Sequence, residues 1–146
     1  ASLMRYRRRL AGPVIDRIDI QIEVPRVRRT DLEKPVAFLT SNSVRAEIEH
    51  ARARQGERFC RKGSTNSAMS PRNIETAALL SSPARRLLLD AVDQMALSAR
   101  AYHRLIKVSR TIADLDGAES VEEGHVLEAL QYRVLDSEPQ AVLSYG

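Results

Sequence analysis

The sequence contains a single cysteine, Cys60, in 146 residues. One thiol cannot build a disulfide framework, and it excludes a zinc site made of several cysteines. It is compatible with a reducing compartment. The three histidines, His50, His103 and His125, lack the short spacing of metal ligands. The sequence therefore predicts no resident metal centre.

Glycine and lysine are also scarce, with six glycines and only three lysines, Lys34, Lys62 and Lys107. The phosphate-cradling pattern G-x-x-x-x-G-K-[S/T] cannot be written anywhere in the chain. By itself this chain is therefore not a complete P-loop ATPase, and we expect it to hold neither ATP nor another cofactor when alone.

No apolar run approaches the roughly 18 residues of a membrane helix, and the segment Ala1–Arg9 is too charged for a signal peptide. The length and the hydrophobic content of 43% suit one ordinary domain with a sizeable core. We expect a soluble, cytoplasmic domain that does not contact membranes.

The net charge of +4 conceals an uneven distribution. Residues 1–62 carry 15 Lys and Arg against 8 Asp and Glu, whereas residues 63–146 carry 8 against 11. Arginine dominates the basic residues, and its planar guanidinium grips phosphate with two parallel hydrogen bonds. The arginine bias fits a phosphate-binding protein, although a GC-rich genome would also produce it.

Residues 18–24 alternate apolar and polar side chains and are followed by Pro25, which predicts one β-strand. A lone strand cannot satisfy its own backbone, so its sheet must come from missing sequence or from a partner. The chain is thus expected to belong to something larger. Residues 26–42 predict a connector with a short apolar element at Val36–Leu39.

The rest of the chain predicts helices. Apolar residues and Gln55 recur at helical spacing from Val44 to Phe59, and residues 61–69 have the composition of a loop. Gly117 is expected in a turn. Start signals predict further helices at Ser70-Pro71, at Ser82-Pro83, from Ser98 to about Asp114, and from the capping box Ser120-Val121-Glu122-Glu123 to about Tyr132.

The helix from Ser98 to Asp114 has an apolar arc that includes Tyr102, Leu105 and Ile106. At about 100° per residue its basic residues fall on the opposite side. They are Arg100, Arg104, Lys107 and Arg110. One interpretation is a solvated surface, and the other is contact with the phosphates of a nucleotide or of a nucleic acid. Arg100 lies in the first turn, where the helix dipole favours an anion.

Arg17 lies at the start of the predicted strand, between Asp16 and Asp19. From residue types alone, an ion-paired structural role is the simpler interpretation. The order of the motifs along the chain gives a second interpretation. A Gly-Pro turn and an arginine beside a strand are followed by a helical segment that contains Ser98-Ala99-Arg100.

These parts resemble the C-terminal portion of the magnesium-chelatase-related AAA+ ATPases, in particular the competence ComM/YifB-type branch. Residues 6–20, YRRRLAGPVIDRIDI, are similar to the family's RYRxRLSGPLLDRIDL, and residues 97–115, LSARAYHRLIKVSRTIADL, to its LSARAYHRILRVARTIADL. Residues 51–59, 66–71 and 128–133 fit its ARxRQxxRF, NxxMSP and closing-helix signals. Departures are mild: Ala11 replaces a serine, and Val14-Ile15 replace two leucines.

The resemblance implies a hexameric ATPase that uses ATP and Mg²⁺, with the nucleotide held between neighbouring subunits of a homohexamer. Arg17 then corresponds to the arginine finger, a catalytic residue, and Arg100 to the nucleotide-binding sensor-2 arginine of the helical lid. Arg104, Lys107 and Arg110 remain the candidate nucleic-acid contacts from the basic side of the helix. The Walker A and Walker B motifs are absent, so the ATPase activity would belong to a longer parent protein.

The expected fold is mainly α. Residues 1–40 would be the C-terminal end of an AAA+ α/β core with one strand, and residues 41–146 a helical lid of four or five helices. The resemblance implies ATP-driven remodelling of DNA by the parent, with branch migration in transformation and recombination as the sharpest version. The alternatives are the motor subunit of a magnesium chelatase and a stand-alone helical nucleic-acid-binding module.

Overall fold

A computed structural model of the protein describes residues 17–22, 24–27, 29, 40–61 and 63–133. This part of the chain is mainly α-helical, as the sequence predicts. Among the described helices, none is long and apolar enough to cross a membrane. The helices are α3 (Ser41–Arg58), α4 (Ile74–Ala78), α5 (Ser82–Met95), α6 (Ala99–Leu115) and α7 (Glu123–Gln131), with a short 3₁₀ helix, η2 (Asn66–Ala68).

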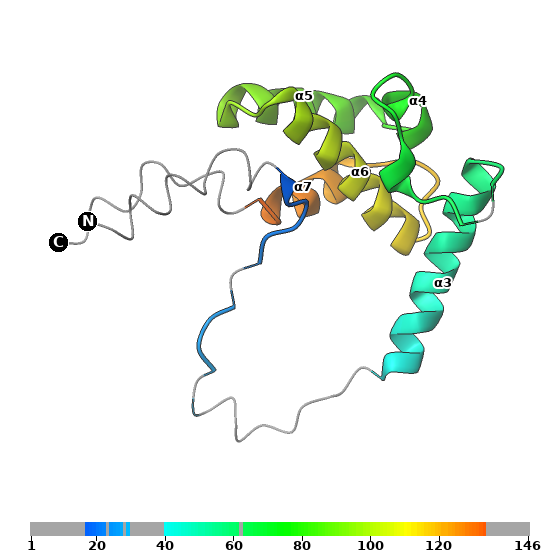
Figure 1. Ribbon diagram of the computed structural model, residues 1–146. Coiled ribbons are helices and arrows are strands. Elements are labelled where there is room, and N and C mark those ends of the chain that lie inside the picture. Colours follow the sequence, from blue (N-terminus) through cyan, green and yellow to red (C-terminus); the bar gives the residue numbers. More distant parts are fainter. Residues whose placement is uncertain (1–16, 23, 28, 30–39, 62, 134–146) are drawn as a thin grey trace.

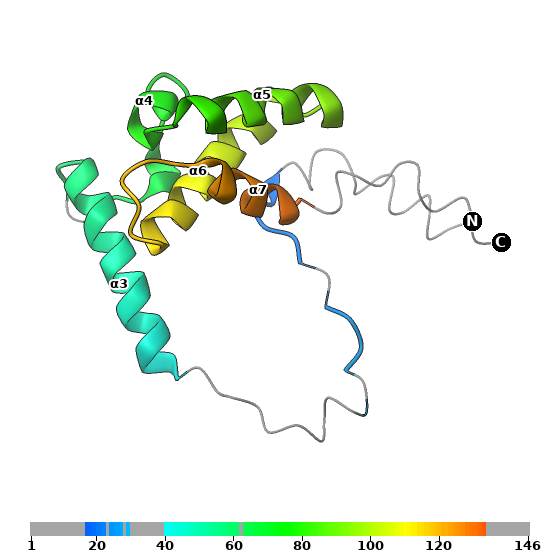
Figure 2. The ribbon, with the colours of Figure 1, turned by 180° about the vertical axis from the view of Figure 1, so that it is seen from behind.

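Helix α6 is the centre of the bundle and contacts α3, α4, α7 and η2, while α5 packs on α7. Figures 1 and 2 show α4 and α5 on one side of α6, and α3 projecting away from the bundle like an arm. The core consists of small and branched apolar side chains that are almost completely buried. Its largest fully buried apolar members are Ile74, Leu88, Leu105, Ile106, Val121 and Val126.

Several helix predictions are confirmed. Helix α3 covers the segment predicted from Val44 to Phe59, although it buries Ala51 and Gln55 and leaves Val44 and Ile48 exposed. The helical spacing of apolar residues thus extends into the N-terminal part of α3, which projects away from the bundle. Ser98 caps α6 by accepting a hydrogen bond from the Ala101 amide at 3.1 Å.

Gly117 lies in the turn after α6 with a φ of +72°, as the sequence predicts. Glycine adopts this left-handed conformation without the steric cost that a Cβ would add. The turn lets the Ala118 amide donate to the Ala113 carbonyl at 2.8 Å, which ends the helix.

The predicted start of α7 was wrong by two residues. The helix begins at Glu123, and its capping box joins Glu122 and His125, not Ser120 and Glu123. Val121 forms an isolated parallel β-bridge with Leu80: its amide donates to the Leu79 carbonyl at 2.9 Å. Since the backbone of Val121 is committed to this bridge, it cannot enter the first helical turn.

The other two serine caps are also displaced. The Ser70 hydroxyl and amide both donate to the Asn73 side chain, and α4 begins only at Ile74. Helix α5 begins at Ser82, but its cap is Ser81, whose hydroxyl accepts from the Ala84 amide at 3.4 Å. Local serine-proline signals located these helices but did not select the capping residue.

The predicted strand at residues 18–24 is absent from the described residues of that segment, 17–22 and 24. Ile18, Ile20 and Ile22 are exposed, while Gln21 is buried and its amide donates to the Tyr132 carbonyl at 2.8 Å. An alternating segment needs a neighbouring strand for its backbone groups. The described part of the chain contains none for it, and Arg17 and Asp19 lie in a 3₁₀ turn and a bend. Asp19 and Gln21 attach the segment to α6 and to Tyr132.

Some predicted features lie outside the described residues. These are the motif before Arg17 and the apolar element at 36–39.

The choice of capping serine gives a testable prediction. Replacing Ser81→Ala removes the side-chain acceptor at the start of α5 and should lower the free energy of unfolding by about 1 kcal/mol. Ser82→Ala, one residue later, is the matched control and should stay within about 0.5 kcal/mol of the original chain. Urea denaturation followed by circular dichroism measures both. If Ser82→Ala lowered the free energy of unfolding more than Ser81→Ala, Ser82 would be the capping residue, as the sequence predicts.

Candidate functional site

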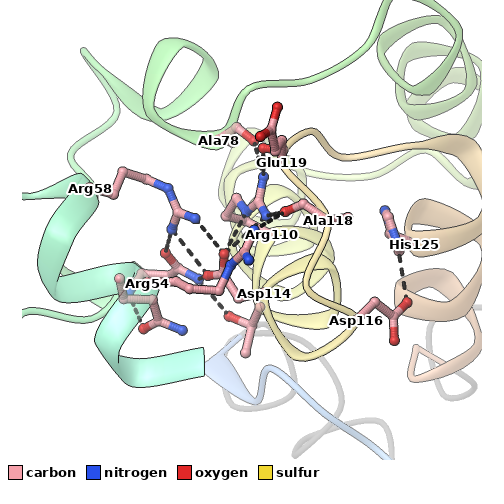
Figure 3. A network of polar contacts seen from close by, with 12 residues as sticks. Arg54, Arg58, Ala78, Arg110, Asp114, Asp116, Ala118, Glu119 and His125 are labelled. Atoms are coloured by element: carbon pink, nitrogen blue, oxygen red, sulfur yellow. Dashed lines mark hydrogen bonds and ion pairs between the residues drawn. The ribbon is translucent and has the colours of Figure 1, made fainter. Parts of the chain in front are cut away.

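The structure separates the four basic residues that the sequence placed on one side of α6. Arg110 is completely buried, so its predicted place on an exposed basic surface was wrong. Its guanidinium donates to three backbone carbonyls, those of Ala78 at 3.3 Å, Glu119 at 2.8 Å and Ala118 at 2.7 Å. Figure 3 shows Arg110 at the centre of this network. In this position it cannot reach a phosphate outside the protein.

Asp114 is the carboxylate of the same network. It accepts from Arg110 Nε at 3.1 Å and pairs with both terminal nitrogens of Arg58, one of them at 3.0 Å. Asn66 Nδ2 adds a hydrogen bond of 2.8 Å. Arg54 donates to the Ala118 carbonyl at 2.9 Å. The network joins α3, η2, α6 and the loop after α6 (Figure 3).

The ionisation of these groups follows from their contacts. Burial alone would raise the pKa of Asp114, but the hydrogen bonds from Arg58 and Asn66 and the charges of Arg110 and Arg58 outweigh it and lower the pKa. Burial lowers the pKa of Arg110, against the attraction of Asp114. Both groups remain charged at neutral pH, so the network is a buried set of ion pairs.

Helix geometry explains why Arg110 was misplaced. It follows Ile106 by four residues and therefore lies only about 40° from it around α6. Ile106 is fully buried, so this flank of the helix faces the core. The C-terminal half of α6 is also covered by α3, which brings Arg58 onto Asp114. The sequence pattern indicated that α6 buries only one side. In its C-terminal half, other elements of the bundle cover more than that side.

Arg104 and Lys107 are partly buried and have partners. Arg104 pairs with Asp19 at 3.0 Å, and Lys107 Nζ donates to the Ser67 carbonyl at 2.8 Å. Both line a groove of about 580 Å³ between the 19–22 segment, α6 and α7. Its walls are otherwise largely apolar, with Ile20, Ile22, Val108, Ile112, Leu115 and Tyr132.

Arg100 is exposed in the first turn of α6. Within the described part of the chain it has no hydrogen bond or ion pair, unlike the other three basic residues of the helix. The N-terminus of α6 adds the positive end of the helix dipole. This arrangement can receive an anion such as a phosphate.

Arg17 is also exposed and lies in the segment whose Gln21 amide is bonded to Tyr132. The ion pair of Asp19 with Arg104 fixes the same segment to α6. Arg17 is therefore carried on a stretch of chain that is held at two points. Among the described residues, no group of three or more His, Cys, Asp or Glu could hold a metal ion.

Comparison with protein families decides the identity of this bundle. Residues 39–133 match the model of the C-terminal region of magnesium chelatase subunit ChlI, and residues 1–32 match the model of magnesium chelatase subunit ChlI. The chain belongs to the magnesium chelatase ChlI family. It forms the C-terminal part of this group of AAA+ proteins, as the sequence motifs indicated.

Individual relatives cover nearly the whole chain. It is 40% identical over 135 residues, 92% of its length, to the competence protein ComM of Haemophilus influenzae. It is 35% identical over 134 residues, 91% of its length, to the protein YifB of Escherichia coli. In both comparisons it matches 26% of the relative, so the chain spans about a quarter of the length of these relatives.

The sequence did not predict that these polar residues form one buried network. Most of them nevertheless belong to the motifs that suggested the ChlI family. Arg54 and Arg58 belong to the 51–59 motif, Asn66 to the 66–71 motif, and Asp114 to the 97–115 motif. The spacing of four residues between Arg54 and Arg58, and between Arg110 and Asp114, was the available signal. It could not show that the two pairs meet.

The network predicts that Asp114→Asn is strongly destabilising. The change leaves Arg58 and Arg110 without their buried counter-charge, and such a loss costs about 3–5 kcal/mol. Asp116→Asn is the control, because the Asp116 carboxylate is exposed to solvent and its contact with His125 is worth about 1 kcal/mol or less. Chemical denaturation of both variants at pH 7 measures the difference; equal effects would contradict the importance of the network.

The same carboxylate predicts the direction of a pH effect. Because the pKa of Asp114 is lower in the folded protein than in the unfolded chain, its stabilising contribution is full above the unfolded value. It is lost as the pH falls toward the lower, folded value. The free energy of unfolding of the original chain should therefore fall steeply below about pH 4. In the Asp114→Asn variant this fall should be shallower, whereas in Asp116→Asn it should be unchanged.

Proposed function

We propose that this chain is the C-terminal lid segment of a hexameric AAA+ ATPase, with residues 1–40 completing the α/β core and residues 41–146 forming the lid. The carrying observation is that α6 directs Arg100 outward from its first turn while its three other basic side chains are engaged within the chain. A cation at a helix N-terminus suits a nucleotide phosphate. In this proposal Arg100 is the sensor-2 arginine and contacts ATP.

Arg17 has the second role in the proposal. It is exposed and precedes Asp19, which anchors its segment to α6. An arginine carried on a fixed segment can reach into the nucleotide site of a neighbouring subunit. There its planar cation would stabilise the charge that develops during phosphoryl transfer. Arg17 would thus act in trans, as an arginine finger of the homohexamer.

ATP and Mg²⁺ would be bound mainly by the part of the longer protein that carries the P-loop. The exposed guanidinium of Arg100 fits a phosphate group. The described residues offer no cluster of carboxylates or histidines for the metal, so the Mg²⁺ ligands would come from that other part. Mg²⁺, when bound, would neutralise charge on the phosphates. Arg100 would bind a phosphate, and Arg17 would stabilise the charge of the transition state.

The substrate that we propose is DNA in the cytoplasm, remodelled by branch migration. The similarity to a protein named for competence supports this choice. Arg104 and Lys107, which line one groove, are the proposed contacts with the DNA backbone, and Arg110 is withdrawn because it is buried. A magnesium chelatase motor is the second candidate, since the matched family model describes subunit ChlI.

The Arg100 assignment is tested against its neighbours in the full-length protein. Arg100→Ala should reduce ATP hydrolysis about ten- to a hundredfold, because a lost charge-assisted hydrogen bond costs about 1.5–3 kcal/mol. Arg104→Ala and Lys107→Ala are the matched controls. They should leave hydrolysis within a few-fold of normal and make DNA binding weaker and more sensitive to salt.

Steady-state ATPase assays and DNA-binding titrations at several salt concentrations measure these effects. Equal losses of hydrolysis in all three folded variants would contradict the sensor role. Unchanged DNA binding in Arg104→Ala and Lys107→Ala would remove the proposed DNA contact.

The Arg17 assignment predicts a large kinetic effect. Arg17→Ala should lower kcat by roughly 10³ to 10⁵ with little change in ATP affinity, since that is the range for an arginine acting on the transition state. An ion pair with Asp16 or Asp19 would account for only about 1 kcal/mol. Mixing Arg17→Ala subunits with subunits that lack the P-loop lysine should restore activity. No recovery in rings shown to contain both variants would remove the trans assignment.

A further inference from the structure

A second polar cluster lies beside the first turns of α6, apart from the Asp114 network. Tyr102 Oη donates to Glu75 Oε1 at 3.0 Å, and Arg85 pairs with Glu75 Oε2 at 2.5 Å. The three residues come from α6, α4 and α5, so one carboxylate connects three helices. Burial and the hydrogen bond with Glu75 raise the pKa of Tyr102, so its hydroxyl stays protonated and remains a donor.

Tyr102 follows Arg100 by two residues and therefore lies about 200° away around the helix. The side of α6 held by Tyr102 is thus opposite to the side that presents Arg100. A bond on one side of a helix resists rotation of that turn about its axis. Fixing Tyr102 against α4 consequently keeps Arg100 directed away from the bundle.

The cluster contributes little to overall stability. The side chains of Glu75 and Arg85 are 40% and 56% exposed, and exposed ion pairs of this kind are weak. The cap at Ser98 and the buried apolar side of α6 hold the helix without it. Loss of the Tyr102 hydroxyl should therefore change the direction of the first turns more than it changes folding.

We propose that Tyr102 and Glu75 are positioning residues, which orient the first turn of α6 so that Arg100 meets the nucleotide phosphate. The proposal rests on the proposed role of Arg100 and adds the device that aims it. Tyr102 itself need not touch the nucleotide. The carboxylate of Glu75 acts as the fixed acceptor on α4, and Arg85 holds that carboxylate in place from α5.

The first arm of the test removes two hydroxyl–carboxylate hydrogen bonds, one at a time, in the full-length ATPase. Tyr102→Phe keeps the ring but removes the hydrogen bond to Glu75, and should lower kcat roughly three- to tenfold. The control is Ser120→Ala, because Ser120 Oγ also donates to a carboxylate oxygen, Glu122 Oε1, at 2.5 Å, outside the groove and away from Arg100. It should leave kcat unchanged. Equal kcat for Tyr102→Phe and the original protein would overturn the proposal.

The second arm identifies the acceptor. Glu75→Gln retains an oxygen that can accept from Tyr102 and should stay close to normal, whereas Glu75→Ala should reproduce Tyr102→Phe. Thermal unfolding of all variants should be nearly unchanged. If Glu75→Gln lost as much activity as Glu75→Ala, the ion pair with Arg85 would be the active element and the hydrogen-bond mechanism would be wrong.

The third arm is a double-mutant cycle that separates this proposal from the function on which it rests. If Tyr102 acts through Arg100, Tyr102→Phe should have no further effect on kcat in the Arg100→Ala background. The same loss in both backgrounds would overturn the positioning role while leaving the sensor role intact. If Arg100→Ala alone had no effect, the sensor role would fail first, and the positioning role with it.

Discussion

The structure depends on the carboxylate of Asp114. It lies on the central helix, is 2% exposed, and holds Arg58 of α3 and Arg110 of its own helix. Arg110 in turn donates to backbone carbonyls of α4 and of the loop after α6. Burying charges is costly unless they are paired and hydrogen-bonded. These contacts therefore fix how α3, α4 and the loop meet α6, and they tolerate few alternatives.

This constraint divides α6 into two parts with different tasks. The C-terminal half is enclosed by α3, α7 and η2, and its polar residues are used to join these elements. The first turns are held by α4 through Tyr102 and carry Arg100 into solvent. A rigid half and an exposed turn on the same helix suit a lid that must present one cation in a defined direction. In the proposed ATPase, the enclosed half would join α6 to the bundle and the exposed first turn would present Arg100 to the nucleotide.

The sequence was most reliable where a pattern depends on nearest neighbours along one helix. The Ser98 cap, the turn at Gly117 and the extent of α6 were predicted because each depends on local backbone geometry. The cap at Ser120 was wrong, since the bridge between Leu80 and Val121 shifts where α7 can begin. The cap of α5 is Ser81, one residue before the predicted Ser82. The strand at 18–24 stays a prediction, because its backbone requires a neighbouring strand from outside this chain and the described residues contain none.

The sequence by itself determined the mainly helical fold and, through its ordered motifs, membership of the ChlI family. It also singled out Arg100, because a first-turn position follows from the cap at Ser98. Only the tertiary structure decided which of the basic residues of α6 are available. Periodicity assigns a residue to a side of one helix, but burial depends on which other helices cover that side. Asp114 is paired with Arg58 because α3, far away in sequence, packs against α6. Arg110 is buried beside α4 and the loop after α6, whose carbonyls it contacts.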